Sequence, residues 1–203
     1  MNTLKAEKRN MEIKAKRLRR EGFVTGNVFG KKIEKSIPLK LERKEVEKLL
    51  KEHGKGSQIL LDVEGQVYDV LIKDVEYNPL KGQVDEIDFQ ELVKGEKVHS
   101  VAEVVLLHHE KVTTGVLQQL IYEIEYKATP DALVEKVEID VSNLRVGDTI
   151  LVKDLPIAAD KDIDLHTDLD ATVVTVYEVH NAASSEDETG EDAEKAEYDK
   201  VII

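Results

Sequence analysis

The chain has 203 residues, with 29 Lys or Arg against 42 Asp or Glu, a formal net charge of −13, and neither Cys nor Trp. This length predicts one or two domains, the lack of Cys excludes disulfides and thiolate metal sites, and apolar residues that are mostly Val, Leu and Ile favour β-rich cores. The charged N-terminus and the lack of a long apolar run argue against a signal peptide and a membrane span, so we expect a cytoplasmic protein with no membrane partner.

The first forty residues are expected to form strands around a short basic helix. Apolar and polar residues alternate over 3–9, which predicts a strand, and a thin apolar stripe over 12–21 predicts a helix that Gly22 ends. Further strands are expected at 24–29 and 37–41. Residues 1–40 carry twelve Lys or Arg against four Asp or Glu, so this is the positive part of an acidic chain.

Residues 43–92 complete a first domain. The spacing of apolar residues predicts a helix over 43–53. Glu64-Gly65 joins two β-branched runs, 58–63 and 66–75, as in a hairpin, and clean alternation predicts a last strand over 84–92. Together these elements predict a mainly β first domain over residues 1–92, a small β-barrel with two short helices.

The second half of the chain is acidic and predicts another all-β domain, over residues 93–180. Residues 93–97 (VKGEK) are typical of a domain junction. The expected strands lie at 98–107, 118–128, 137–141, 149–152 and 171–179. The remaining residues, 181–203, are rich in Ala, Ser, Glu and Asp and are expected to be a disordered acidic tail.

The basic run at residues 14–20 (KAKRLRR) holds five positive charges in seven residues with no acidic residue among them. Neighbouring positive charges repel one another, and bound phosphate groups would relieve that repulsion. The planar guanidinium of Arg is well suited to binding phosphate. The alternative is an ordinary solvated helix face. RNA is the partner we favour, because an A-form duplex is recognised by shape through its phosphates and shallow minor groove. Five further cations extend the positive region: Arg9, Lys31, Lys32, Lys35 and Lys40.

The strand expected at 84–92 offers an acceptor near these cations. Alternation puts Glu86 and Asp88 on the face opposite Ile87 and Phe89. A carboxylate such as that of Asp88 can accept hydrogen bonds from guanine amino groups in the minor groove. The alternative is an exposed strand carboxylate with no ligand.

Catalytic and metal-binding patterns are missing from the sequence. The single His cluster, His108-His109-Glu110, would point its two imidazoles to opposite faces of a strand, and no second group has ligand spacing. No phosphate-binding glycine loop, nucleophile elbow or zinc-protease motif occurs. We therefore expect no enzyme activity, catalytic residue, cofactor, metal or small-molecule substrate.

A series of short motifs resembles a known family by its order and spacing. In the first domain these are Arg9, the segment Leu18-Arg19-Arg20 with Gly22, the pair Phe29-Gly30, the segment Lys73-Asp74-Val75 with Pro79, and Glu86-Ile87-Asp88-Phe89. In the second they are Gly115-Val116-Leu117-Gln118 and the stretch from Val141 to Asp148. Over about residues 3–180 the chain is similar to the two-domain form of bacterial large-subunit ribosomal protein number twenty-five, which includes the general stress protein Ctc.

That resemblance implies a structural component of the large (50S) ribosomal subunit, acting in translation and stress. Its barrel would bind 5S rRNA at the loop E region, and neighbouring ribosomal proteins are possible further partners. Carried over residue by residue, the RNA contacts would be Arg9, Lys14, Arg19, Arg20 and Asp88. We add five candidate RNA-binding residues: Lys16, Arg17, Phe29, Lys73 and Glu86.

The chain departs from the family's usual pattern at several of these positions. Phe29 stands where Tyr is usual, which removes a hydroxyl donor, and Glu86 stands where His is usual, which adds an anion beside Asp88. Lys16 replaces a small hydroxyl residue and adds a cation. An alternative function is therefore a protein-interaction module, ribosome-associated or free, whose 5S rRNA binding is weakened or lost.

Overall fold

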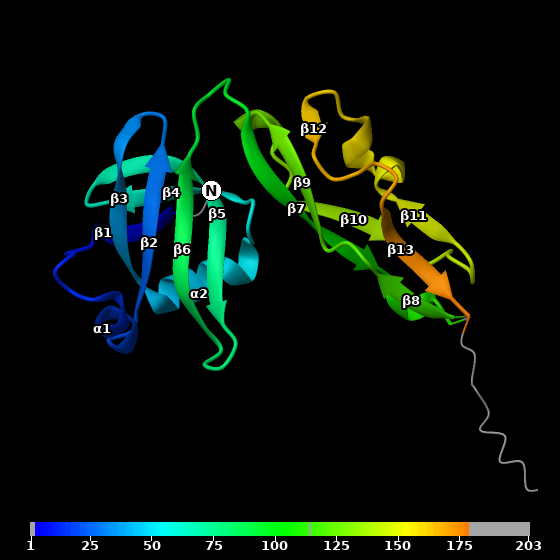
Figure 1. Cartoon of the computed structure of the whole chain (residues 1–203), viewed down its shortest axis with the longest axis horizontal. Coiled ribbons are helices and arrows are strands. Elements are labelled where there is room, and N and C mark those ends of the chain that lie inside the picture. Colours follow the sequence, from blue (N-terminus) through cyan, green and yellow to red (C-terminus); the bar gives the residue numbers. More distant parts are fainter. Residues whose placement is uncertain (1–2, 114, 179–203) are drawn as a thin grey trace, which may run out of the picture.

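The computed structural model describes residues 3–113 and 115–178, and these form two β-rich domains that lie side by side (Figure 1). The expectation of a mainly β protein with an N-terminal barrel, two helices and a second β domain is confirmed. The tail expected over 181–203 lies outside the described residues. No helix within the described part of the chain has the length and apolarity needed to cross a membrane.

The N-terminal domain is a closed barrel in which six strands follow the order β1-β3-β2-β6-β5-β4. Most neighbouring strands are antiparallel, but β1 pairs parallel with β4, and β2 pairs parallel with β6. Closure leaves the barrel without an unpaired edge. The strands are β1 (Thr3–Lys8), β2 (Phe23–Gly30), β3 (Ile33–Glu42), β4 (Gln58–Val63), β5 (Gln66–Asn78) and β6 (Gln83–Glu91).

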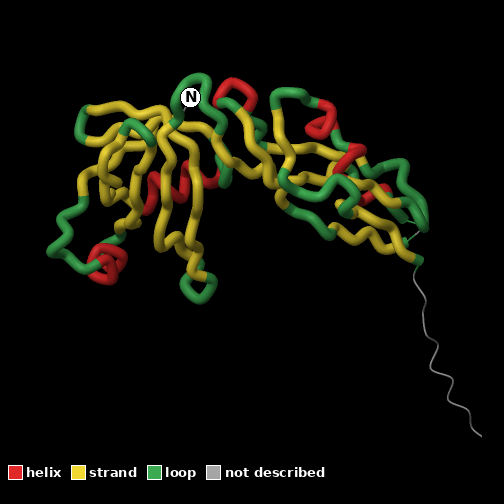
Figure 2. The backbone as a smooth tube through the Cα atoms, turned by 45° about the horizontal axis from the view of Figure 1, so that its top comes forward, coloured by secondary structure: helices red, strands yellow, loops and turns green. Residues whose placement is uncertain are grey.

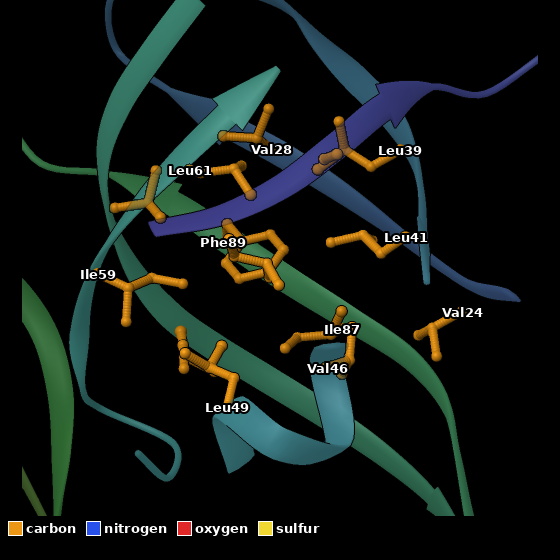
Figure 3. Packing of buried hydrophobic residues seen from close by; sticks show 14 of the residues in the cluster. Val24, Val28, Leu39, Leu41, Val46, Leu49, Ile59, Leu61, Ile87 and Phe89 are labelled. Carbon is orange, nitrogen blue, oxygen red and sulfur yellow. The ribbon is translucent and has the colours of Figure 1, made fainter. Parts of the chain in front are cut away.

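Alternating apolar residues of these strands fill the barrel, with Phe89 at the centre of the view in Figure 3. Helix α2 (Arg43–Glu52) adds Val46 and Leu49 to the same cluster, as its spacing predicted. The expected hairpin between β4 and β5 is also confirmed. Its two turn residues, Glu64 and Gly65, have φ of 52° and 93°, as a two-residue hairpin turn with the favoured twist requires.

Helix α1 (Ala15–Arg20) is shorter than the 12–21 span expected from its apolar stripe. Two local hydrogen bonds hold the preceding residues in a turn. The Asn10 side chain accepts from the Glu12 amide at 2.9 Å, and the Arg9 guanidinium donates to the Ile13 carbonyl at 3.2 Å. The helix ends as expected at Gly22, whose φ of 94° terminates it in the left-handed region.

The second domain consists of a four-stranded sheet in the order β10-β7-β9-β12 and a three-stranded sheet in the order β11-β13-β8. Their inner faces enclose a cluster centred on Ile124, Tyr126 and Val173. The strands are β7 (Val98–Leu107), β8 (Val116–Gln119), β9 (Glu123–Ala128), β10 (Lys136–Asp140), β11 (Thr149–Leu151), β12 (Ile163–Leu165) and β13 (Thr172–Tyr177). Short 3₁₀ turns span His109–Lys111, Pro130–Ala132, Val152–Asp154 and Pro156–Ala159.

Two expectations for this domain were wrong. Residues 118–128 are not one strand, because the chain changes sheets between β8 and β9, and Leu120 and Tyr122 are exposed at the change. His108 and His109 are not strand residues on opposite faces, because β7 ends at Leu107 and His108 takes a left-handed φ of 57°.

The two domains contact each other through the α2–β4 loop, β5 and β7, which lie next to one another in Figures 1 and 2. Gly56 comes so close to β7 that a Cβ atom there would lie 2.0 Å from the Val101 carbonyl oxygen. A small apolar cluster of Leu71, Leu92 and Val98 joins barrel and second domain, with Leu133 packed against it. The junction is thus packed rather than an open linker.

Candidate nucleic-acid interface

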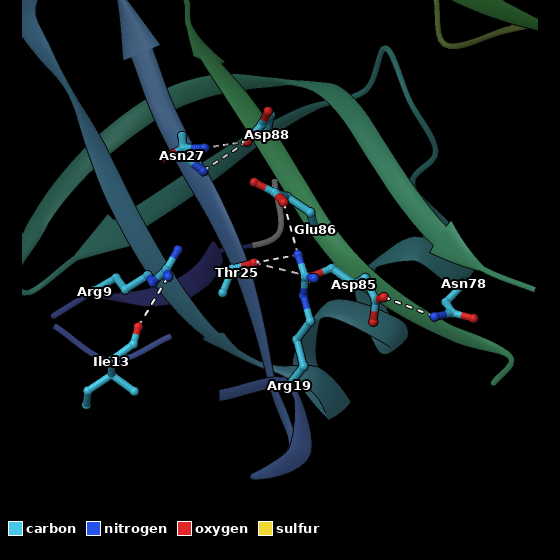
Figure 4. Close-up of polar contacts among 9 residues, drawn as sticks. All are labelled: Arg9, Ile13, Arg19, Thr25, Asn27, Asn78, Asp85, Glu86 and Asp88. Atoms are coloured by element: carbon cyan, nitrogen blue, oxygen red, sulfur yellow. Dashed lines mark hydrogen bonds and ion pairs between the residues drawn. The ribbon is translucent and has the colours of Figure 1, made fainter. Parts of the chain in front are cut away.

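The outer surface of the β2–β6 pair collects several of the residues singled out in the sequence. In this parallel pairing Thr25 is opposite Glu86 and Asn27 is opposite Asp88. Since Val24, Val28, Ile87 and Phe89 point into the core, the alternating residues between them point outward. Figure 4 shows Arg9, Arg19, Glu86 and Asp88 around this surface.

Asp88 is held by the residue opposite it. Its Oδ1 atom accepts from the backbone amide of Asn27 at 3.0 Å and from the Asn27 side-chain amide at 3.1 Å. Its second oxygen, Oδ2, accepts no hydrogen bond from any described residue. The carboxylate is therefore fixed in orientation and keeps one oxygen for an external donor. Phe29 lies two residues beyond Asn27 on the outer face of β2 and is 36% exposed.

A bulge in β6 gives Arg19 its position. Glu86 pairs with Glu76 of β5 and Val84 pairs with Tyr77, so Asp85 is an extra residue and the clean alternation expected over 84–92 fails at this point. The Asp85 carbonyl oxygen accepts from Arg19 Nε at 2.9 Å. The same guanidinium donates to Thr25 Oγ1 at 3.2 Å and to Glu86 Oε2 at 3.1 Å.

Glu86 lies between acidic and basic neighbours. Its pKa is raised, first by partial burial and then by the carboxylates of Asp88 and Glu76, while Arg19 and Arg9 act in the opposite direction. The charge at this position is thus only partly compensated. Glu86 faces the same surface as Asp88, so the surface carries two carboxylates where a phosphate would meet repulsion.

The cations of α1 and of its N-cap residue, Lys14, differ in the residues that they contact. Arg17 pairs with Glu21 at 2.8 Å, which partly corrects the expectation of uncompensated repulsion in the basic run. Lys14, Lys16 and Arg20 are exposed, and their side chains make no ion pair or hydrogen bond within the described residues. They are the cations available to an external anion.

Comparison with known proteins gives the same assignment along both domains. Residues 4–89 match the model of the ribosomal L25p family, and residues 97–180 match the C-terminal domain of ribosomal protein TL5. A large ribosomal subunit protein bL25 of Enterococcus faecalis is 32% identical, covering 89% of this chain and 89% of the relative. The chain belongs to the ribosomal L25p family.

Other relatives with the same description are similar over the same span. The bL25 protein of Caldanaerobacter subterraneus is 30% identical, covering 93% of this chain and 96% of its own length. The bL25 protein of Listeria monocytogenes is 33% identical, covering 86% of this chain and 84% of its own length. The similarity inferred from the motifs is thus confirmed for both domains.

Within this member of the L25p family, Lys73 lies away from the other singled-out residues. It is the extra residue of a second irregularity, where Asp88 pairs with Asp74 and Phe89 with Ile72. Its ammonium donates to the His99 carbonyl at 2.9 Å, in the cleft between the domains. Partial burial and then Lys55 lower the pKa of Lys73. The hydrogen bond from Lys73 to His99 therefore links the barrel to the second domain.

Several residues of this candidate interface were not found from the sequence. Thr25 and Asn27 escaped notice because their partners depend on a parallel pairing between strands about sixty residues apart. Asp85 contributes through its carbonyl, which residue type does not reveal. Lys81 lies in the turn between β5 and β6, beside Lys16, Arg19 and Arg20. No group of three or more potential metal ligands occurs among the residues that the structure describes.

Proposed function

We propose that this chain is a structural component of the large ribosomal subunit and that it binds 5S rRNA, in the loop E region, through α1 and the outer face of β2 and β6. Membership of the L25p family supports the ribosomal role. The observations that carry the RNA contact are the exposed, unpaired cations Lys14, Lys16 and Arg20 in and just before α1, and the oriented carboxylate of Asp88 on the outer face of the barrel. The protein would act in the cytoplasm with the ribosome, in translation and, as in the Ctc-type relatives, in stress.

In this proposal the chain holds RNA by shape and catalyses no reaction. Lys14, Lys16 and Arg20 would contact phosphates and release their condensed counterions. The unpaired oxygen of Asp88 would accept from a guanine amino group, which lies in the shallow minor groove of an A-form duplex. Phe29 would pack against a sugar or base, since it lacks a hydroxyl donor.

The Arg19–Glu86 pair favours a second candidate function. A guanidinium that already donates to a carboxylate, a hydroxyl and a carbonyl has less to offer a phosphate, and Glu86 repels phosphates nearby. In this alternative the domain binds 5S rRNA weakly or not at all, and the chain recruits a protein partner instead.

Titration of a 5S rRNA loop E duplex at several salt concentrations tests the proposal. We expect salt-dependent binding that drops at least tenfold when Lys14→Ala and Arg20→Ala are combined, because two phosphate contacts are lost. As a matched control, a double variant of two exposed lysines of the other domain, Lys111→Ala with Lys161→Ala, should bind normally. Undetectable binding, together with absence from purified large subunits at moderate salt, would refute it and favour the alternative.

A further inference from the structure

A cleft between α1 and the turn that follows β5 lies at one end of the barrel. It has a volume of about 330 Å³ and is lined by Lys16, Arg19, Arg20, Lys81 and Asp85. Helix α1 and this turn are found at the same end of the barrel in Figure 1. Three residues of the cleft come from the basic run, and Lys81 joins them from a segment more than sixty residues further along the chain.

The cleft carries more positive charge than its own residues neutralise. The side chains of Lys16, Arg20 and Lys81 are exposed and contact no acidic group among the described residues. The single carboxylate of the cleft, that of Asp85, accepts a hydrogen bond from the side-chain amide of Asn78 at 3.1 Å. Three cations thus surround one carboxylate that is already engaged.

Arg19 differs from these three cations in its contacts and burial. Its side chain is 27% exposed, and it donates to Asp85, Thr25 and Glu86 of the barrel. Its own carbonyl accepts from the guanidinium of Arg43 at the start of α2. These bonds fasten α1 to β2, β6 and α2, so Arg19 keeps the helix at a fixed place beside the cleft.

We propose that the cleft binds a phosphate of the RNA backbone through Lys16, Arg20 and Lys81, and that Arg19 positions α1 without binding phosphate itself. This inference rests on the proposed function, and it adds Lys81 and a division of roles that the sequence did not indicate. The long reach of a Lys side chain from an exposed turn allows it to follow the RNA backbone, whereas the three bonds of Arg19 hold it to the protein.

Salt dependence and thermal stability separate the two roles. Each lost phosphate contact lowers the slope of log affinity against log salt concentration by about one, whereas loss of the bonds that hold α1 to the barrel lowers the stability of the free protein. We therefore expect Lys81→Gln to weaken binding of the loop E duplex about fivefold near physiological salt and to reduce the slope by about one. Arg19→Gln should weaken binding and also lower the melting temperature of the free protein, which Lys81→Gln should leave unchanged.

Lys161→Gln in the second domain removes the same charge from an exposed lysine outside the cleft and serves as the control. Circular dichroism checks that each variant folds. The inference alone is overturned if the wild-type protein binds the duplex while Lys81→Gln matches Lys161→Gln in affinity and slope, or if Arg19→Gln keeps the melting temperature of the wild-type protein. If the wild-type protein does not bind the duplex, the proposed function and this inference fail together.

Discussion

Arg19 and Glu86 form an ion pair on the outer surface of the barrel. Each side chain therefore partly neutralises the charge that the other could offer to a ligand. The sequence showed that Glu86 departs from a simple picture of a basic RNA-binding face, since it puts an acid beside Asp88. It could not show that the acid would contact Arg19, because that contact depends on the bulge at Asp85 and on where α1 lies. Single residue identities thus predicted the composition of the surface but not its pairing.

The raised pKa of Glu86 predicts a specific pH dependence of stability. Partial burial is its main cause, so the folded state holds the proton at higher pH than the unfolded state does. Stability contributed by this group is complete below the unfolded pKa and is lost as the pH rises through the folded one. Glu86→Gln removes the titration, so the melting temperature of the variant should rise relative to that of the wild type as the pH increases from below the ordinary pKa of a Glu side chain through the raised pKa of Glu86.

The same substitution should strengthen RNA binding, because it removes a carboxylate from the path of phosphates while Arg19 keeps its bonds to Asp85 and Thr25. Glu138→Gln, at an exposed acid of the second domain, controls for the change in net charge. A melting-temperature difference that stays constant or reverses over this pH range would contradict the assignment for Glu86, as would RNA affinity equal to that of Glu138→Gln.

The elements of the barrel differ in how far the sequence predicts them. Hairpin β4–β5 and helix α2 were predictable because local signals suffice: an acidic-glycine turn in one case and apolar spacing with a following Gly in the other. The pairing of β2 with β6 was not, since parallel strands distant in sequence carry no local signature. The change of sheets between β8 and β9 escaped for a similar reason, because an unbroken β-type composition conceals it.

Gly26 lies at a close approach of β2 to β6 and provides a test at the scale of these elements. A Cβ atom there would lie 2.0 Å from the Ile87 carbonyl oxygen, so Gly26→Ala must push the strands apart. We expect a loss of about 2 kcal/mol or more in the free energy of unfolding, measured in urea. Gly54→Ala is the matched control, because nothing lies within 4 Å of its added methyl and its stability should stay equal or rise. Equal stability of the two variants would contradict the close approach.

At the scale of the whole molecule, charge is divided between the two ends of the chain. Residues 93–203 carry ten Lys or Arg against twenty-five Asp or Glu, so RNA phosphates would repel this half of the chain. A packed junction between the domains would fix the direction in which the acidic second domain projects when the barrel is docked. The sequence indicated a junction near 93–97, but it held no sign that Gly56, Leu71 and Lys73 of the barrel would contact the second domain.

Gly56 is the residue on which this packing depends most directly. Gly56 has a φ of 86°, and a Cβ atom added there would lie 2.0 Å from the Val101 carbonyl oxygen. Gly56→Ala therefore cannot keep the contact with β7. The hydrogen bond from Ser100 Oγ to the Gly56 carbonyl, at 3.5 Å, would be lost as well. We expect the variant to have a larger radius of gyration in X-ray scattering and to unfold in two calorimetric steps. Gly65→Ala is the control, because it imposes the same left-handed strain, with φ of 93°. Nothing lies within 4 Å of its added methyl, and it is remote from the second domain. The radius of gyration of this variant should therefore match that of the wild type. If Gly56→Ala also keeps the wild-type radius and unfolds like Gly65→Ala, the domains are not held by this contact, and the acidic half is free to change direction relative to the barrel.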